Sequence, residues 1–272
     1  MRRTLRSGRA GSPLPPRNGL GAARLTLPPG GPWVTLRDDT LLVVDKPHFL
    51  ATIPRGRHVV ETALVRLRRD LDLPTLSPAH RLDRVTAGLL MFVVRPELRG
   101  AYQTLFRDRL VRKTYEAVAA YDPGLELPRT VRSRIVKERG VITAQEMPGP
   151  PNAETHVDLI EHRDGLGRYR LTPRTGRTHQ LRLHMSGLGV PILGDDFYPV
   201  LTETALDDST RPLQLLATTL EFTDPVSGAP RRFSSARTLR PPAAQTWAPR
   251  PARARPPEST SAPAGAARPV GW

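Results

Sequence analysis

The sequence predicts one α+β domain flanked by two tails that stay outside its core. Short apolar runs that end at Pro or Gly recur at irregular intervals, which predicts strands of mixed length. Segments with apolar residues at helical spacing lie between these runs. Such irregular interleaving favours an α+β domain over a regular doubly wound sheet. A chain of 272 residues can build one domain with a substantial core or two small domains.

The two ends of the chain differ from its middle in composition. Residues 1–32 hold no acidic residue and are rich in Arg, Gly and Pro, which predicts a flexible basic arm. A mitochondrial transit peptide has a similar composition, but this density of Pro and Gly disfavours its amphipathic helix. Residues 240–272 are rich in Pro, Ala and Arg and predict a second disordered tail. The folded domain is therefore expected at 33–239.

The first half of the domain predicts two strands and two helices. The segment 40–47 is apolar until it reaches Pro47, which suits a strand that ends in a turn. Residues 61–71 carry apolar side chains at helical spacing with Arg on the other face. The continuous apolar run at 88–94 predicts a buried strand. Residues 96–110 begin with Pro and continue with periodic apolar residues, which predicts a helix.

The second half predicts three strands and one helix. The segments 113–121, 153–162 and 168–173 alternate or resemble strands in composition. The segment 178–189 is expected to be helical, because Thr178 can cap its start and Gly187 can end it.

The charge of the chain indicates a polyanionic partner. Forty-one Lys and Arg against 26 Asp and Glu give a net charge of +15 and a pI near 11.3. Nucleic acid is favoured over a membrane because no basic amphipathic helix stands out. The alternative is that Arg is abundant through codon bias and that part of the charge belongs to solvated tails. No protein partner is implied, and a monomer is expected.

Several kinds of site and location are disfavoured. The chain has no Cys, so it offers no disulfide framework and no thiolate chemistry, and a zinc site would need His and carboxylates alone. No stretch approaches about 18 consecutive apolar residues, and the first residues lack the apolar core of a secretory signal. These features predict a cytoplasmic protein without a metal.

One acid stands out at the start of the buried strand. Asp83 lies between Arg81 and Arg84 in a polar turn before the run at 88–94. Helical neighbours that face each other are three or four residues apart, so pairing on a helix surface explains these one- and two-residue spacings poorly. A turn before a buried strand is instead a place where a rigid element presents a side chain to a cleft.

A second polar loop and two lysines complete the candidate site. The segment 172–184 enters a helix and contains Arg174, Arg177 and Arg182. Lys occurs only three times in this Arg-rich chain, and Lys46 and Lys113 both fall in short motifs. We expect Lys46 to be either structural or directed at a phosphate.

These segments together resemble the RluA-type family of RNA pseudouridine synthases. The run HRLDRVTAGLLMFV matches the family's catalytic motif, with Ala87 where Ser is usual. LLVVDKP, KTYEA and TGRTHQLRLH resemble three further motifs, and GVPILGDDFY and LQLLATTLEFTDP resemble the closing segments. The matches follow the family's order over roughly residues 37–225.

The resemblance implies a fold and a role for each matching residue. The family fold is a mixed, mostly antiparallel sheet flanked by helices and loops, and it needs no cofactor or metal. By resemblance, Asp83 is the essential carboxylate, Arg81 enters the space left by a flipped base, Tyr115 stacks on the uracil and Arg182 pairs with Asp83. We also expect RNA, either ribosomal or transfer RNA, to contact Arg84, Lys113, Arg174, Arg177 and His179.

The chemistry and several residues leave alternatives open. Asp83 can attack C1′ or remove the C2′ proton, and the sequence does not choose. His80 is expected to be structural, and His179 and His184 lack the spacing of a zinc pair. Asp195 and Asp196 are expected to form a turn after Gly194. A glycoside hydrolase would need two opposed carboxylates, and a non-catalytic RNA-binding protein would not explain the ordered motifs.

Overall fold

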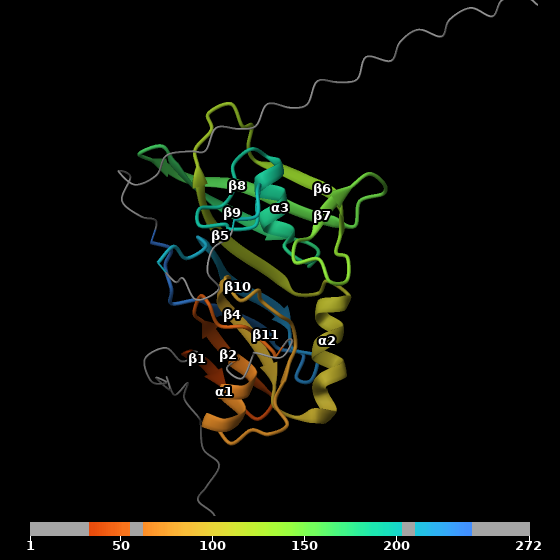
Figure 1. Cartoon of the computed structure of the whole chain (residues 1–272). Coiled ribbons are helices and arrows are strands. Elements are labelled where there is room, and N and C mark those ends of the chain that lie inside the picture. The colour runs from red at the N-terminus through yellow and green to blue at the C-terminus, as the bar shows by residue number, and fades with distance from the viewer. Residues whose placement is uncertain (1–32, 55–61, 203–209, 241–272) are drawn as a thin grey trace, which may run out of the picture. The chain divides into compact units, whose positions relative to one another are not determined.

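The computed structural model describes residues 33–54, 62–202 and 210–240. The basic arm expected at 1–32 and the tail expected at 240–272, apart from Arg240, lie outside the described residues. Strands and helices follow the chain in an irregular order, as Figure 1 shows.

The described strands join in one sheet of eleven strands. They are β1 (Trp33–Arg37), β2 (Leu41–Lys46), β3 (Ser77–Pro78), β4 (Ala87–Val93), β5 (Arg112–Ala120), β6 (Arg129–Val136), β7 (Gln145–Met147), β8 (Ala153–Arg163), β9 (Leu166–Pro173), β10 (Leu215–Thr223) and β11 (Pro230–Ser234). The helices are α1 (Ala63–Asp70), α2 (Arg99–Arg107) and α3 (Gln180–Gly187), with a short 3-10 helix η1 (Pro96–Leu98) before α2.

The sheet is mixed and mostly antiparallel. Its strand order is β1-β2-β4-β10-β5-β9-β8-β6-β7, with β11 beside β10 and β3 beside β4. Every pairing among the described strands is antiparallel except that of β4 with β10. The expected fold class is confirmed, and the two central strands β4 and β10 join the two halves of the sheet (Figure 1).

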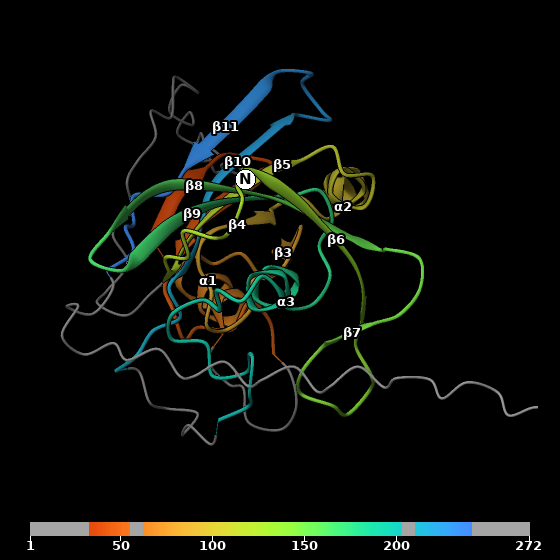
Figure 2. The ribbon, with the colours of Figure 1, turned by 90° about the horizontal axis from the view of Figure 1, so that it is seen from above.

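Both faces of the central strands are covered. Leu90 and Phe92 of β4 pack in one cluster with α1 and α3, whereas Leu89 and Met91 pack on the opposite face with α2. Figure 2 shows α1 and α3 on the same side of the curved sheet. A strand buried on two faces needs apolar residues at every position, which explains the continuous run that predicted it.

A glycine permits the close approach of the two central strands. Gly88 has a φ of +107°, and a Cβ there would lie 2.2 Å from the carbonyl oxygen of Ala217 in β10. Only glycine fits this position, because other residues would meet both the steric clash and the unfavourable backbone conformation. The contact places β10, and through it β5, beside the turn that carries Asp83.

The expected elements agree with the structure in type, but several boundaries differ, and the helix expected at 96–110 already ends at Arg107. The helix expected at 178–189 begins at Gln180, and its N-cap is His179 in a left-handed conformation with a φ of 56°. Thr178 therefore does not cap the helix. Strands β1, β3, β6, β7, β10 and β11 were not predicted.

Candidate active site

A cavity of about 810 Å³ gathers the predicted site residues from distant parts of the chain. It lies between the loop 80–86 before β4, the turn 106–109 after α2 and the loop 173–179 that leads into α3. Its lining includes Arg81, Asp83, Arg84, Lys113, Tyr115, Arg177, His179 and Arg182. Arg174 is the one predicted site residue that does not line it. Asp83 is the only Asp or Glu among the described lining residues.

The residue before Asp83 is fixed by a threonine. The hydroxyl of Thr52 donates to the carbonyl of Leu82 at 2.8 Å and accepts from its amide at 3.1 Å. Because both side chains are buried, water does not compete for these bonds. The turn itself is closed by the amide of Thr86, which donates to the carbonyl of Asp83 at 3.1 Å.

Two basic side chains at and just after the end of β2 hold the residues after Asp83. The buried ammonium of Lys46 donates to the carbonyls of Pro47, Leu50 and Arg84 at 3.0, 2.8 and 3.4 Å. Burial lowers the pKa of Lys46 to about 7, against an opposing effect of the Asp83 charge. His48 Nδ1 donates to the carbonyl of Val85 at 2.7 Å. Lys46 is thus structural, which decides between the two roles that the sequence left open.

His80 is also structural, as expected. Its Nε2 accepts from the amide of Met91 at 3.1 Å, and its ring stacks on Phe106 with centroids 4.5 Å apart. Burial lowers the pKa of His80 to about 3, so the ring is neutral and keeps the lone pair that this bond needs. The loop that carries Asp83 is therefore anchored at both ends, which preorganises the carboxylate.

The two arginines beside Asp83 in the sequence do not form ion pairs with its carboxylate. No ion pair to its carboxylate occurs within the described ranges. Arg81 is exposed, and the guanidinium of Arg84 lies 5.6 Å from the ring centroid of Phe49. The negative charge of Asp83 instead acts on two buried cations: it opposes the lowering of the Lys46 pKa by burial, and it contributes to the raised pKa of Arg182.

The expected ion pair of Arg182 with Asp83 is wrong, because a different carboxylate takes the guanidinium. Arg182 donates from Nε to Asp195 Oδ2 at 2.8 Å and from a terminal nitrogen to Oδ1 at 2.5 Å. Burial acts to lower the pKa of Arg182, but the hydrogen bond and charge of Asp195, together with the charge of Asp83, raise it above its ordinary value. Asp195 also forms the expected turn, since its Oδ1 accepts from the amides of Phe197 and Tyr198.

Tyr115 and Lys113 lie on β5 along the wall of the cavity. Tyr115 is 9% exposed and belongs to the core cluster beneath the cavity. Burial and the Asp83 charge raise its pKa, so its hydroxyl stays protonated. Lys113 Nζ donates to the carbonyl of Thr175 at 3.2 Å and so ties β5 to the loop before α3. Burial and the charge of Arg109 lower the pKa of Lys113.

The loop before α3 is held by a buried glutamine. Gln180 accepts from the Thr175 hydroxyl at 2.7 Å and from the amide of Arg177 at 3.0 Å. The exposed guanidinium of Arg177 donates to the carbonyl of Asn152 at 3.2 Å. Arg174 is exposed and lies 3.9 Å from Glu154, on the rim outside the cavity.

Two lining arginines were missed by the sequence analysis. Arg107 ends α2 and Arg109 lies in the turn between α2 and β5, and both are exposed. Arg109 has a φ of 61°, which is uncommon for a residue other than glycine. Only the high Arg content of the segment 107–112 could have pointed to them.

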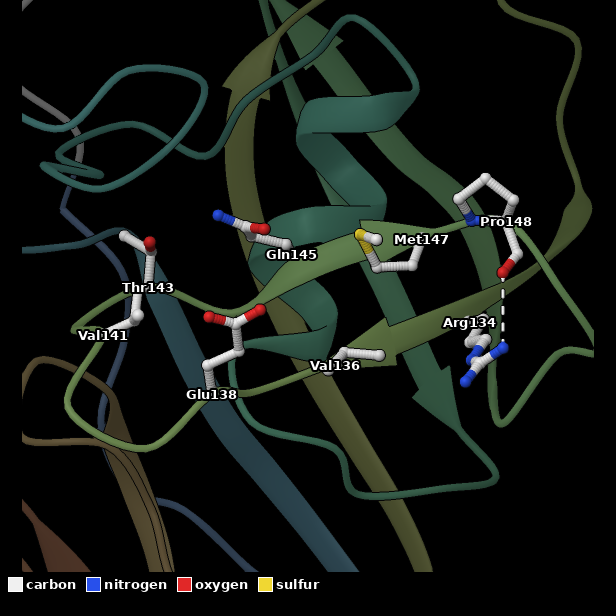
Figure 3. A pocket seen from close by; sticks show the side chains of 8 residues that line it. All are labelled: Arg134, Val136, Glu138, Val141, Thr143, Gln145, Met147 and Pro148. Carbon is white, nitrogen blue, oxygen red and sulfur yellow. Dashed lines mark hydrogen bonds between the residues drawn. The ribbon is translucent and has the colours of Figure 1, made fainter.

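A smaller cavity lies away from this site. It measures about 210 Å³ and is lined by side chains of β6, β7 and their connection (Figure 3). Arg134 donates to the carbonyl of Pro148 at 3.4 Å at its edge. None of the predicted site residues lines this cavity.

Neither metal binding nor a membrane crossing finds support in the described residues. No group of three or more His, Asp or Glu is arranged to hold a metal ion in this part of the chain. Among the helices at 33–54, 62–202 and 210–240, none has the length and apolar character that a membrane crossing needs.

Comparisons with known proteins agree on one family. The family model for RNA pseudouridylate synthases matches residues 40–187. The chain is 34% identical over 212 residues to the dual-specificity RNA pseudouridine synthase RluA of Yersinia pestis, over 74% of this chain and 96% of the relative. It is 31% identical over 223 residues to the protein of that name from Escherichia coli strain K12, over 76% and 95% of the two chains.

Two human structures share the fold. Human RNA pseudouridylate synthase domain containing 1 aligns with a TM-score of 0.57 and 23% identity, over 79% of this chain and 93% of its own. Human RNA pseudouridylate synthase domain containing 4 aligns with a TM-score of 0.56 and 24% identity, over 76% and 88%.

Proposed function

The chain belongs to the RluA-type family of RNA pseudouridine synthases, and from this membership we propose that Asp83 is its essential carboxylate and that it acts on uridines of ribosomal or transfer RNA. The observation that carries the proposal for Asp83 is its position as the only acid among the described residues that line the large cavity. Its anchored loop and the cationic surroundings support the same role.

The reaction needs one carboxylate and no redox partner. Converting uridine to pseudouridine breaks the bond between N1 and C1′, turns the base and joins C5 to C1′. The C5 proton moves to solvent and N1 gains a proton, so atoms and charge balance. Asp83 either attacks C1′ or removes the C2′ proton, and both steps require its ionised form. The positively charged side chains around the cavity favour the ionised form of Asp83.

The other lining residues hold the extruded nucleotide and its neighbours. A base inside a helical stack is out of reach, so the uridine must leave the stack. We assign to Tyr115 the aromatic face against the uracil and to Arg81 the space that the base vacates. We assign contacts with phosphates to the exposed guanidinium groups of Arg81 and Arg177 and to the half-buried Arg84. Arg174 on the rim and Lys113 in the wall extend this basic surface.

The chain is proposed to act as a cytoplasmic monomer without a cofactor. The isomerisation involves no net oxidation or hydrolysis, which removes the need for a redox group.

The proposed activity is tested by mapping pseudouridine in RNA. Total RNA from cells that lack the gene is incubated with the purified chain, and pseudouridine positions are compared with those of untreated RNA. New pseudouridine at one or a few positions is expected, and the sequence around them identifies the RNA. A binding protein or a glycosidase would form no pseudouridine, and free uracil would indicate the glycosidase.

A further inference from the structure

His179 lies in the cavity wall with one ring nitrogen bound and the other open. Its Nδ1 is 2.9 Å from the hydroxyl of Tyr198. Within the described ranges, Nε2 makes no hydrogen bond to another residue. It is also not one of the fully buried side-chain nitrogen and oxygen atoms that lack a hydrogen-bond partner there. Nε2 is therefore accessible, and His179 is one of the residues that line the 810 Å³ cavity.

The partners of Tyr198 determine which nitrogen of His179 carries the proton. The Tyr198 hydroxyl donates to the carbonyl of Ala144 at 2.9 Å and accepts from the amide of Ala144 at 2.9 Å. A phenol has one hydrogen to donate, and the carbonyl can only accept. Toward His179 the hydroxyl is therefore an acceptor, and Nδ1 must carry the hydrogen.

The opposite nitrogen is consequently an acceptor. Burial lowers the pKa of His179 from its ordinary value, although the Asp83 charge opposes this effect. In a neutral imidazole with the proton on Nδ1, Nε2 presents a lone pair. The wall of the cavity that holds Asp83 thus contains an acceptor whose ring is fixed by Tyr198.

The backbone at His179 supports a role beyond packing. Its φ of 56° places a non-glycine residue in the left-handed region directly before α3. Such strained positions cluster at functional sites, where the surrounding contacts fix them. Here the conformation directs the ring to Tyr198 and the cavity instead of capping the helix.

We propose that His179 Nε2 accepts a hydrogen bond from the 2′-hydroxyl of the target uridine and so makes the site select ribose over deoxyribose. The target offers two donors, the uracil N3–H and the 2′-hydroxyl. The proposed function places C1′ or C2′ at Asp83, and the 2′-hydroxyl is bonded to C2′. Asp83 and His179 interact electrostatically across the cavity without an ion pair between them, which leaves room for this group. The 2′-hydroxyl is the group by which proteins distinguish RNA from DNA.

Two substitutions separate the acceptor from the rest of the ring. His179→Asn places an amide where Nδ1 lies, so it keeps the bond to Tyr198 and tolerates the left-handed backbone, but it has no group at Nε2. His179→Gln reaches further and offers a carbonyl oxygen near the Nε2 position. Thermal unfolding of both variants checks that the fold is kept.

The experiment measures binding in the Asp83→Asn background, so that turnover does not change the ligand. The probe is a synthetic RNA around the pseudouridine that the wild-type chain forms, with ribose or 2′-deoxyribose at that uridine alone. If the chain forms no pseudouridine, the proposed function fails on its own, and oligouridylate and its 2′-deoxy counterpart serve as probes.

The selectivity for ribose decides the proposal. With His179 or His179→Gln, the ribose probe should bind about two- to tenfold more tightly than the deoxyribose probe. With His179→Asn this ratio should fall close to one, because only binding of the ribose probe weakens. An unchanged ratio in His179→Asn, or an equal loss for both probes, would overturn the proposal, and the equal loss would assign Nε2 to another donor such as N3–H.

Discussion

The guanidinium of Arg182 donates two hydrogen bonds to the carboxylate of Asp195, one to each oxygen, at 2.8 and 2.5 Å. The two side chains are 3% and 1% exposed, and the guanidinium carbon lies 4.6 Å from the ring centroid of Phe197. Two such hydrogen bonds fix the orientation of the guanidinium. Its charge still acts on Asp83, so Asp195 holds in place a cation that serves the neighbouring acid.

Removing the charge of Asp195 should strongly destabilise the fold. Asp195→Asn leaves the Arg182 guanidinium buried without a counter-ion, so the free energy of unfolding should fall by about 3 to 5 kcal/mol. Chemical denaturation measures this loss. Glu154→Gln is the matched control, because its partners Arg132 and Arg174 are exposed, and it should cost less than about 1 kcal/mol. Equal losses of unfolding free energy in both variants would show that the buried ion pair stabilises the fold no more than an exposed one.

Two substitutions of Tyr115 should separate the ring from the hydroxyl. Tyr115→Phe should bind substrate RNA as tightly as the wild type, since stacking needs no hydroxyl. Tyr115→Leu should lose the aromatic face and with it about 1 to 3 kcal/mol of binding free energy. Titration of both variants with one substrate stem-loop checks this. Equal affinities would remove stacking from the role of Tyr115.

The buried His184 should make the fold sensitive to acid. Its Nδ1 is 2.8 Å from the Thr155 hydroxyl and its Nε2 is 3.0 Å from the Ser133 hydroxyl, and burial lowers its pKa to about 4. Between pH 6.5 and 4 the unfolded chain gains a proton that the folded chain does not, so stability is lost as the pH falls through this window.

The variant His184→Asn should lose that part of the pH dependence. Its stability relative to the wild type should rise by about 2 to 3 kcal/mol between pH 7 and pH 4, because each unit of pKa shift corresponds to about 1.4 kcal/mol. Denaturant unfolding at a series of pH values gives the difference. A stability difference between variant and wild type that stays constant with pH would mean that His184 does not titrate in this way.

Arg107 should contribute one phosphate contact. Arg107→Gln should reduce the slope of log K against log salt by roughly 0.7, the value for one phosphate of a single strand. Arg163→Gln is the matched control: both residues are exposed and paired with the next residue, but only Arg107 lines the cavity. Salt titrations of RNA binding compare the two, and an equal change in both slopes would contradict a specific contact at Arg107.

The sequence predicted elements where burial leaves a pattern along the chain. The apolar runs of β2 and β4 were recognised because both faces of these strands are covered. Strand β6 was missed because its three Arg residues are exposed and it has few apolar residues. Pairing with β8 therefore determines this strand more than its own composition does. The start of α3 was misplaced because His179 takes a left-handed backbone that no local propensity favours.

The sequence predicted which residues line the cavity better than it predicted which of them form ion pairs. Ordered motifs brought Asp83, Tyr115 and Arg182 to one cavity, as expected from the resemblance. The partner of Arg182 could not be inferred, since Asp195 meets it through a turn 13 residues further along the chain. Spacing along the sequence carries no information on such contacts between separate loops.

Isomerisation by the Asp83→Asn variant tests the essential carboxylate most directly. Release of tritium from RNA labelled at C5 of uridine reports turnover, and a binding titration on the same RNA reports affinity. The amide keeps the shape of the carboxylate but can act neither as nucleophile nor as base. The matched control is Asp196→Asn, because Asp196 does not line the cavity and should be replaceable. Tritium release should be absent for Asp83→Asn, with RNA affinity within a few fold of the wild type, whereas release at a rate near that of the wild type would contradict the assignment of Asp83.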